Sequence, residues 1–264
     1  MDNNSSDFIV NFDEKPKLNN PVLIEGLPGI GQVGKIAAEH MVEEFKAKKF
    51  ATLLSHSFPP QVLVNPNGMV ESMKNEFHYV KGDRDLIILT GNTQAATTEG
   101  QYRLCEKIID VAKEFGCSMV YTVGGFGIGR NVDEPNVYGA VNNEGLIKKL
   151  ESQNVILERS GIGHIIGASG LLLSLSKLRD MDAVCLMGET SGFYVDPKSA
   201  KVVLEALGTH LGIKINLKNL EKKAKEVEKM TAEAAEIEKK ILEEMGAIPQ
   251  PEIAPDEDKM RYIG

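Results

Sequence analysis

The residues best suited to chemistry by type and spacing are glycines that follow a short apolar run. Residues 22–24 are Val-Leu-Ile, and the glycines at 29, 31 and 34 fit the pattern G-x-G-x-x-G. In that pattern a strand turns into a helix close to a bound pyrophosphate. Residues 29–35 also fit the first seven places of G-x-x-x-x-G-K-[ST], in which Lys35 would reach a phosphate group. Both patterns raise the hypothesis of a nucleotide site.

Each pattern lacks the residue that would carry its chemistry. A dinucleotide site needs an acidic residue about 20 positions further on to hold the ribose, and residues 52–56 are Thr-Leu-Leu-Ser-His. The second pattern needs a hydroxyl group for Mg²⁺ where the chain has Ile36. We therefore interpret the glycines as residues that let a strand pass into a helix without a Cβ clash, and we predict no cofactor. A nucleoside- or phosphate-binding enzyme that uses the glycine-rich loops stays as the alternative.

The other reactive residue types do not form a recognisable constellation. Ser169 lacks the G-x-S-x-G spacing of a nucleophile elbow. In a parallel sheet the loops that carry Glu99, Arg130, Asp133 and Glu189 would meet at the carboxyl edge, where the enzyme alternative would place its site. We predict no catalytic residue and no metal ligand, because no two histidines stand at helical spacing. The histidines are His40, His56, His78, His164 and His210.

Composition excludes several classes of function. The 264 residues carry a formal net charge of −8, which disfavours nucleic acid as a partner because phosphate binding needs a basic face. Cys105, Cys117 and Cys185 lie far apart, so we expect reduced cysteines rather than a disulfide framework or a zinc site. No apolar run approaches the ~18 residues of a membrane span, and the first residues do not resemble a signal peptide. We expect a cytoplasmic protein without a membrane partner.

Strand-like apolar runs alternate with helical patterns along most of the chain. Asp196 and Pro197 are a helix start, with Asp196 as N-cap and Pro197 in the first helical position. Strands that alternate with helices predict an α/β fold with a mostly parallel sheet and helices on both faces. We expect strands at residues 22–24, 52–55, 84–90, 118–123, 138–141, 155–157 and 183–187, a small antiparallel meander at 62–80 and an added edge strand at 8–10.

The composition changes after the α/β region. Residues 216–245 are rich in Lys, Glu and Ala and contain no Gly or Pro, which predicts a helical extension. Leu217, Leu220, Ala224 and Val227 repeat at steps of three and four, as in a coiled-coil seam, and we predict that this stripe serves self-association or packs on the body. Residues 246–264 form an acidic, proline-containing tail that we expect to be flexible. The predicted organisation is thus a polar segment at 1–20, a domain at 21–215, the helix at 216–245 and the tail.

Four short motifs together carry a family resemblance. They are GLPGIGQVG at residues 26–34, SFPP at 57–60, GGFG at 124–127, read as a turn, and GASGLL at 167–172. As a set they resemble the proteasome assembly chaperone family in its archaeal form, over about residues 21–215. The resemblance implies a fold like that of the nucleoside phosphorylases, followed by one helical extension.

The same resemblance implies a function. A chain of this family is expected to be a homo-oligomer, with a tetramer favoured, and to bind proteasome α-subunits or the 20S core particle without ATP or catalysis. Relatives carry a C-terminal hydrophobic-Tyr-any-residue signature that inserts between α-subunits. Here the corresponding residues are Met260, Arg261, Tyr262, Ile263 and Gly264, and Tyr262 stands third from the end, where the signature has it second. Assembly and activation remain alternatives within this expectation.

Overall fold

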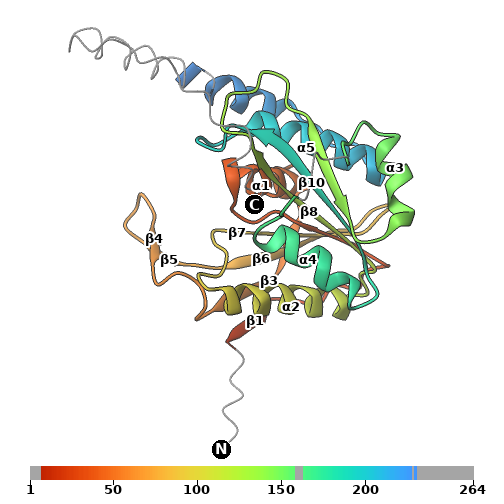
Figure 1. The fold of residues 1–264 in the computed structure, drawn as a ribbon. Coiled ribbons are helices and arrows are strands. Elements are labelled where there is room, and N and C mark those ends of the chain that lie inside the picture. Colours follow the sequence, from red (N-terminus) through yellow and green to blue (C-terminus); the bar gives the residue numbers. More distant parts are fainter. Residues whose placement is uncertain (1–6, 158–162, 228, 231–264) are drawn as a thin grey trace, which may run out of the picture.

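A computed structural model of the chain describes residues 7–157, 163–227 and 229–230. Its centre is an eight-stranded sheet with the strand order β1-β3-β6-β7-β2-β8-β10-β9 (Figure 1). The strands are β1 (Phe8–Phe12), β2 (Val22–Glu25), β3 (Lys48–Ser55), β6 (Asn75–Val80), β7 (Leu86–Gly91), β8 (Met119–Gly127), β9 (Val137–Val141) and β10 (Asp182–Thr190). The predicted edge strand near residue 8 is confirmed as β1, which pairs with β3.

The middle of the sheet is parallel and its flanks are antiparallel. β7, β2, β8 and β10 are parallel neighbours, while β6, β3 and β1 extend the sheet on one side and β9 on the other by antiparallel pairing. All four residues of β2 are buried, as expected for a strand covered on both faces. The carboxyl ends of the parallel strands therefore meet along one edge, which we call the carboxyl edge.

Helices cover both faces of the sheet, as predicted (Figure 1). One face is packed by α1 (Val33–Glu44) and α5 (Pro197–Leu211), and the other by α2 (Thr98–Glu114) and α4 (Ala168–Lys177), with α2 beside α4. The short α3 (Ile147–Glu151) follows β9, and the 3₁₀ turns η1 (Ile30–Gln32) and η2 (Glu144–Leu146) precede α1 and α3. The predicted start of α5 is confirmed, because the Asp196 side chain accepts a hydrogen bond from the Ser199 N–H.

Two expectations about local structure were wrong. Residues 124–127 do not turn but continue β8, and the glycine at 125 is needed because a Cβ there would lie 2.4 Å from the Ile30 carbonyl oxygen. Residues 155–157 contribute one isolated bridge, between Ile156 and Tyr138, rather than a full strand. In residues 124–127 the glycines therefore allow another backbone segment to lie close to β8, rather than forming a turn.

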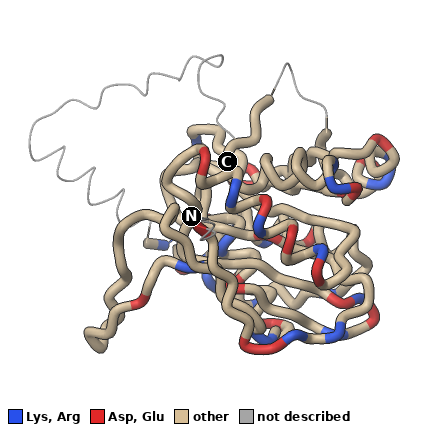
Figure 2. Tube along the Cα trace, turned by 90° about the horizontal axis from the view of Figure 1, so that it is seen from below, with Lys and Arg blue, Asp and Glu red and all other residues tan. Residues whose placement is uncertain are grey.

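A separate hairpin, β4 (Val62–Val64) and β5 (Val70–Ser72), leaves the body between β3 and β6. Of the meander predicted for residues 62–80, these two strands form their own small sheet and β6 joins the main one. The hairpin projects from the body at the left of Figure 1, and in Figure 2 it is drawn almost entirely in tan because it has few charged residues.

The beginning of the C-terminal extension is a helix packed on the body. Residues 218–227 are helical, Leu220 is completely buried and Ala224 is nearly so, in the apolar cluster between the sheet, α1 and α5. Leu217 is partly buried against the same cluster, and Val227 is half-buried. His40 of α1 donates from Nε2 to the Asn216 carbonyl oxygen over 2.8 Å. Leu220 and Ala224 therefore use their apolar surface within one chain, and self-association through this stripe stays a prediction.

Candidate functional site

The glycine-rich turn after β2 is filled by the protein's own backbone. A Cβ at Gly26 would lie 2.2 Å from the Gly34 carbonyl oxygen, and a Cβ at Gly34 would lie 2.3 Å from the Val123 carbonyl oxygen of β8. Gly31 has φ of 61°, a left-handed conformation that favours glycine. Lys35, the residue that would reach a phosphate, pairs with the Glu39 carboxylate one helical turn further along α1. The glycines thus bring β2, α1 and β8 together, which accounts for them without a nucleotide.

A pocket of about 610 Å³ lies beside this turn, within the size range of ligand pockets. It opens at the carboxyl edge between the loop after β2, the N-terminal turn of α2 and the segment that leads into α4. This is where open parallel sheets bind ligands. The lining residues are Gly29, Ile30, Gln94, Ala95, Thr97, Thr98, Gln101, Tyr102, Ile165, Ile166, Gly167 and Leu171.

Gln94 joins the three segments that form the pocket. Its Nε2 donates to the Pro28 carbonyl oxygen over 2.7 Å, and its Oε1 accepts from the Ala168 N–H over 3.0 Å and from Gln101 Nε2 over 2.6 Å. Gln101 Oε1 in turn accepts from the Ala95 N–H. A single amide side chain thereby holds the β2 loop, the β7 loop and the first residue of α4 in register.

The walls of the pocket are uncharged and mainly apolar. None of its lining residues is Lys, Arg, Asp or Glu. The amides of Gln94 and Gln101 bond to each other and to the backbone, which uses part of their hydrogen-bonding capacity. A phosphate group is normally held by Arg, Lys or a nest of backbone N–H groups with a cation nearby. The chemistry of these walls favours an apolar occupant over a nucleotide.

A buried carboxyl group, Glu25, ends β2 close to these segments. It is 1% exposed, accepts a hydrogen bond from the Leu27 N–H over 3.0 Å, and accepts another from the Ser169 hydroxyl over 3.3 Å. Burial raises the pKa of Glu25 to about 7, and the two hydrogen bonds reduce that rise. The group joins β2 to the first turn of α4, and sequence reasoning missed it.

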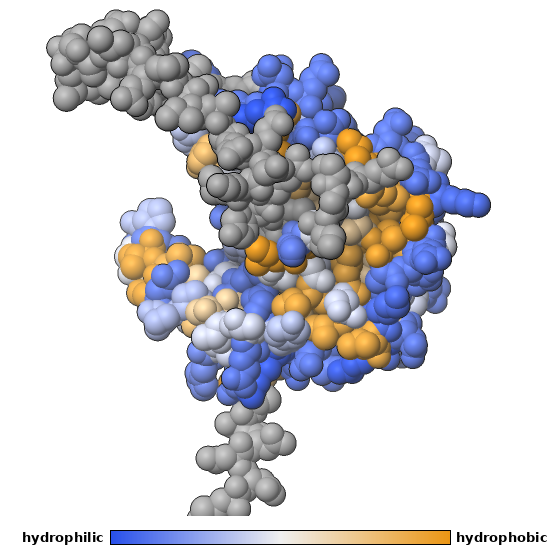
Figure 3. Space-filling model, in the orientation of Figure 1, coloured by the Kyte–Doolittle hydropathy of each residue, from blue (hydrophilic) through white to orange (hydrophobic). Residues whose placement is uncertain are grey.

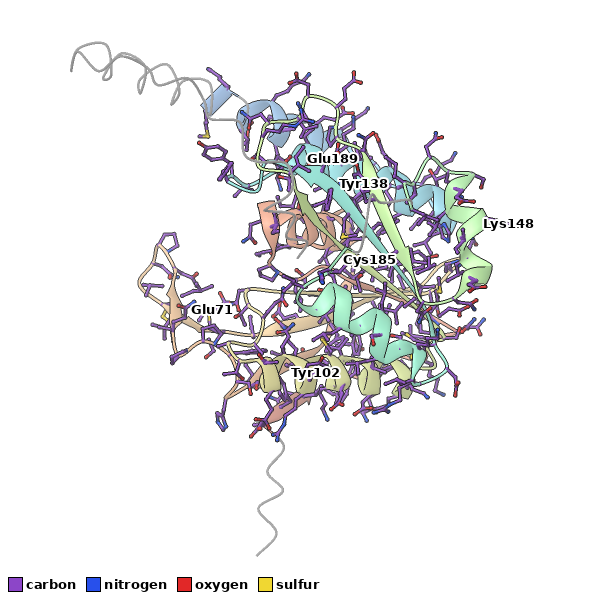
Figure 4. All side chains as sticks on the ribbon, in the orientation of Figure 1. Glu71, Tyr102, Tyr138, Lys148, Cys185 and Glu189 are labelled. Atoms are coloured by element: carbon purple, nitrogen blue, oxygen red, sulfur yellow. The ribbon has the colours of Figure 1, made fainter. Side chains whose placement is uncertain are left out.

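The four charged residues predicted to meet at the carboxyl edge do not form one cluster. Glu99 bonds to Arg103 one turn along α2, and Arg130 and Asp133 lie exposed in the loop after β8. Glu189 accepts hydrogen bonds from Asn136 and from the Tyr138 hydroxyl, and Figure 4 shows Glu189 and Tyr138 on neighbouring strands. Glu25 and Gln94 each stand at or just after the end of a buried strand, which is the sequence signal that could have found them.

Among the residues that the structure describes, no group of three or more His, Cys, Asp or Glu side chains could hold a metal ion. Cys105, Cys117 and Cys185 are free and buried. Burial raises the pKa of the Cys117 thiol to about 12 and that of Cys105 still further, so neither provides a thiolate at neutral pH. No described helix has the length and apolarity that crossing a bilayer would need.

The comparisons with known proteins agree with this fold. The structure is similar to that of Pyrococcus furiosus PbaB, described as an archaeal proteasome activator, with 42% identity, a TM-score of 0.83, and coverage of 87% of this chain and 99% of that one. P. furiosus PbaA, described as an archaeal homolog of proteasome-assembly chaperone, is 28% identical with a TM-score of 0.73, over 90% of this chain and 96% of that one. MJ1210 of Methanocaldococcus jannaschii is 44% identical over 94% of this chain and 93% of its own length.

The model of the PAC2 family matches residues 23–235, which include the α/β domain after β1, the glycine-rich turn, the pocket and the start of the C-terminal helix. The family resemblance expected from the four motifs is thereby confirmed. This chain, whose structure is similar to those of P. furiosus PbaB and PbaA, belongs to the PAC2 family.

Proposed function

We propose that this protein is a non-catalytic adaptor that binds the α-subunits of the proteasome core particle and promotes its assembly or activation without ATP. The observation that carries the proposal is the likeness to PbaB, which extends over nearly the whole of that chain at 42% identity. That protein is described as a proteasome activator, and PbaA as a homologue of an assembly chaperone.

The chemistry of the described residues supports an adaptor rather than an enzyme. The glycine turn is packed by backbone, the pocket walls carry no charge, and burial raises the pKa of the Cys105 and Cys117 thiols. An enzyme that acted on nucleosides or phosphate would need hydrogen-bonding or cationic groups that remain available to the substrate. Glu25, the one strongly shifted carboxyl described above, is already bonded to Leu27 and Ser169.

The proposal assigns partner binding to the C-terminal residues Met260, Arg261, Tyr262, Ile263 and Gly264, which lie outside the described residues. The helix at 218–227 is held to the body by Leu220 and by the His40 bond, so the residues that follow start from a fixed place. Several such tails on one oligomer would raise the effective concentration of each docking segment near the core particle.

Binding to an archaeal 20S core particle tests the proposal. Full-length chain, a chain that ends at Met245 and a Tyr262→Ala variant are compared by co-sedimentation and by hydrolysis of a fluorogenic peptide. We expect the full chain to bind and the other two to bind at least tenfold more weakly. Pro255→Ala, a change in the same segment outside the docking residues, is the matched control and should bind like the full chain.

The failure of every version to bind the core particle or free α-subunits would remove the proposal. Equal binding by the full and truncated chains would support the adaptor function but would show that the α/β body, and not the tail, contacts the core particle. Calorimetry with nucleosides and with inorganic phosphate addresses the enzyme alternative. Saturable micromolar binding of either ligand, reduced by Thr98→Val in the pocket and accompanied by turnover, would favour the enzyme.

A further inference from the structure

A buried carboxyl group faces α4 with no cation paired to it. Glu25 is 1% exposed, and the hydrogen bonds that reach it come from the Leu27 N–H and the Ser169 hydroxyl. In the described part of the chain, no Lys, Arg or His side chain forms an ion pair with it. An ionised carboxylate is costly at such a place, because two donors replace only part of the water that burial removes. Ionisation therefore favours any movement that lets water reach the group.

Four elements pack around this carboxyl group. Its register partners are Leu89 of β7 and Thr122 of β8, and Ser169 bonds to it from α4. Cys105 of α2 is also near, since burial and then the charge of Glu25 raise the pKa of its thiol. That thiol keeps its proton at neutral pH, and the other three side chains do not titrate there. Among these neighbours, Glu25 alone changes its charge between pH 5 and pH 8.

The first turn of α4 separates Glu25 from the pocket. Gly167 and Leu171 stand one helical turn apart and line the pocket. Ser169 lies between them in the chain, so it points to the other side of the helix, where its hydroxyl bonds to Glu25. The pocket of about 610 Å³ has room for water. A displacement of this turn would connect the buried carboxyl group to the water of the pocket.

Of the elements around Glu25, α4 can move with the least disruption. β2 is hydrogen-bonded to β7 on one side and to β8 on the other. The amphipathic α2 has 17 residues, whereas α4 has 10 and begins after Gly167, whose φ of 85° favours glycine. In Figure 3 the surface over α4 faces the viewer and carries apolar side chains, drawn in orange, so α4 belongs to the outer layer. Short outer elements open at a lower free energy than central strands.

We propose that Glu25 and Ser169 form a pH-sensitive switch in which ionisation of the carboxyl group opens the first turn of α4 and widens the pocket. In acid the carboxyl group is neutral, the Ser169 contact is kept, and the wall that residues 165–167 form with this turn is closed. Towards neutral pH the open form gains, because water reaches the carboxylate there. Access to the pocket then depends on pH. The inference concerns the pocket wall and stands apart from binding to the proteasome.

Amide exchange of the full-length chain tests the switch at the N–H groups of Ala168 and Leu171, which are hydrogen-bonded in the closed form. The carboxyl group has a pKa near 4.5 when hydrated and about 7 when buried. After correction for intrinsic exchange, the open population should therefore rise about 40-fold between pH 5 and pH 7 and less than about twofold between pH 7 and pH 8. Both amides should exchange faster than those of β10, which report global unfolding.

Three variants separate the switch from ordinary packing. Glu25→Gln removes the titration and should make the protection of the two amides independent of pH. Glu189→Gln, the same change at a buried carboxyl group of β10, is the matched control and should keep the wild-type pH profile. Ser169→Ala removes a hydrogen bond that lowers the pKa of Glu25, so the rise in exchange should continue to a higher pH. A packing role alone for Ser169 would not move that pH.

Two results in the wild-type chain would overturn the inference. If Ala168 and Leu171 exchange as slowly as β10 at every pH, the first turn of α4 does not open separately. If they exchange faster but with equal protection at pH 5 and pH 7, the opening leaves Glu25 buried. Should Glu25→Gln fail to fold, Ser169→Ala decides the question, because an unchanged pH profile in that variant would exclude the Glu25–Ser169 contact as the switch.

Discussion

The Ser169 hydroxyl donates a hydrogen bond to the buried Glu25 carboxyl group, with 3.3 Å between Oγ and Oε2. The bond joins the end of a central parallel strand to the first turn of α4. Ser169 is held in turn, since its carbonyl oxygen accepts from the Thr122 hydroxyl of β8. Three elements of the parallel core are thus linked by polar groups directly behind the pocket segments.

The raised pKa of Glu25 predicts a pH-dependent stability. The unfolded carboxyl loses its proton near pH 4.5, whereas the folded one keeps it up to about pH 7. Its contribution to the free energy of unfolding is therefore fully present below pH 4.5 and is lost as the pH rises through 7. At about 1.4 kcal/mol per pKa unit, the loss is roughly 3 kcal/mol.

Glu25→Gln removes this titration while keeping the shape of the side chain. Urea unfolding at pH 5 and pH 8 should show that the variant gains about 2.5 kcal/mol relative to wild type between the two values, since part of the loss occurs below pH 5. His210, whose pKa is lowered to about 4 mainly by burial, contributes with the opposite sign. It titrates in both proteins, so its effect cancels in the difference. Parallel pH profiles for the two proteins would contradict the prediction.

Gly34→Ala tests whether the glycine turn is a packing device. The added Cβ would meet the Val123 carbonyl oxygen at 2.3 Å, so β8 and α1 must move apart. We expect the free energy of unfolding to fall by about 2–4 kcal/mol, although alanine is normally the better helix residue. Gly82→Ala is the matched control, since its nearest neighbour would be 3.9 Å away, and it should change stability by less than about 0.5 kcal/mol. Equal effects in the two variants would argue against the packing role.

Gln94→Ala should loosen the pocket segments together. The change removes acceptors or donors for Pro28, Gln101 and Ala168, and we expect a cost of about 1–3 kcal/mol from the groups left unpaired. Amide exchange should accelerate at Ala168 more than at residues of β10. Gln61→Ala, at an exposed residue beside the hairpin, is the control and should leave both quantities unchanged. Unaltered exchange at Ala168 in the Gln94 variant would show that another contact holds the segment.

Leu220→Ala measures how firmly the C-terminal helix is attached. Leu220 is fully buried against the α1–α5 cluster, so its truncation should cost about 2–4 kcal/mol if this helix unfolds together with the body. Limited proteolysis should then cut sooner within residues 218–227. Lys222→Ala, exposed on the same helix, is the control. A loss below about 0.5 kcal/mol with faster cleavage would mean that the helix detaches independently of the domain.

The sequence predicted the elements whose signals are local. Asp196 and Pro197 specify the start of α5 by their own side-chain chemistry, and the buried run of β7 is apolar throughout. The alternation of strand and helix patterns was enough to predict the α/β fold class. The order of the antiparallel strands at the two sides of the sheet could not be predicted from the sequence. Strand order depends on which strand edges meet and not on the composition of each strand.

The candidate site was predicted less well because it depends on distant contacts. The reason for a glycine at position 125 appears only in the structure, where a Cβ on Gly125 would lie 2.4 Å from the Ile30 carbonyl oxygen. Gln94 acquires its role from Pro28 and Ala168, which are 66 and 74 residues away in the chain. Glu99 and Glu189 were expected to converge, but Glu99 bonds to Arg103 and Glu189 bonds to Tyr138. Local patterns do not encode such pairings.

The attachment of residues 218–227 to α1 and α5 has a geometric consequence. Lys201 of α5 also pairs with Glu221 over 3.0 Å, so this helix is held by charge as well as by Leu220. In a symmetric oligomer, the fold would set the distances between the positions at which the terminal segments leave each body. Such an oligomer would bind best to targets whose binding sites are separated by the same distances.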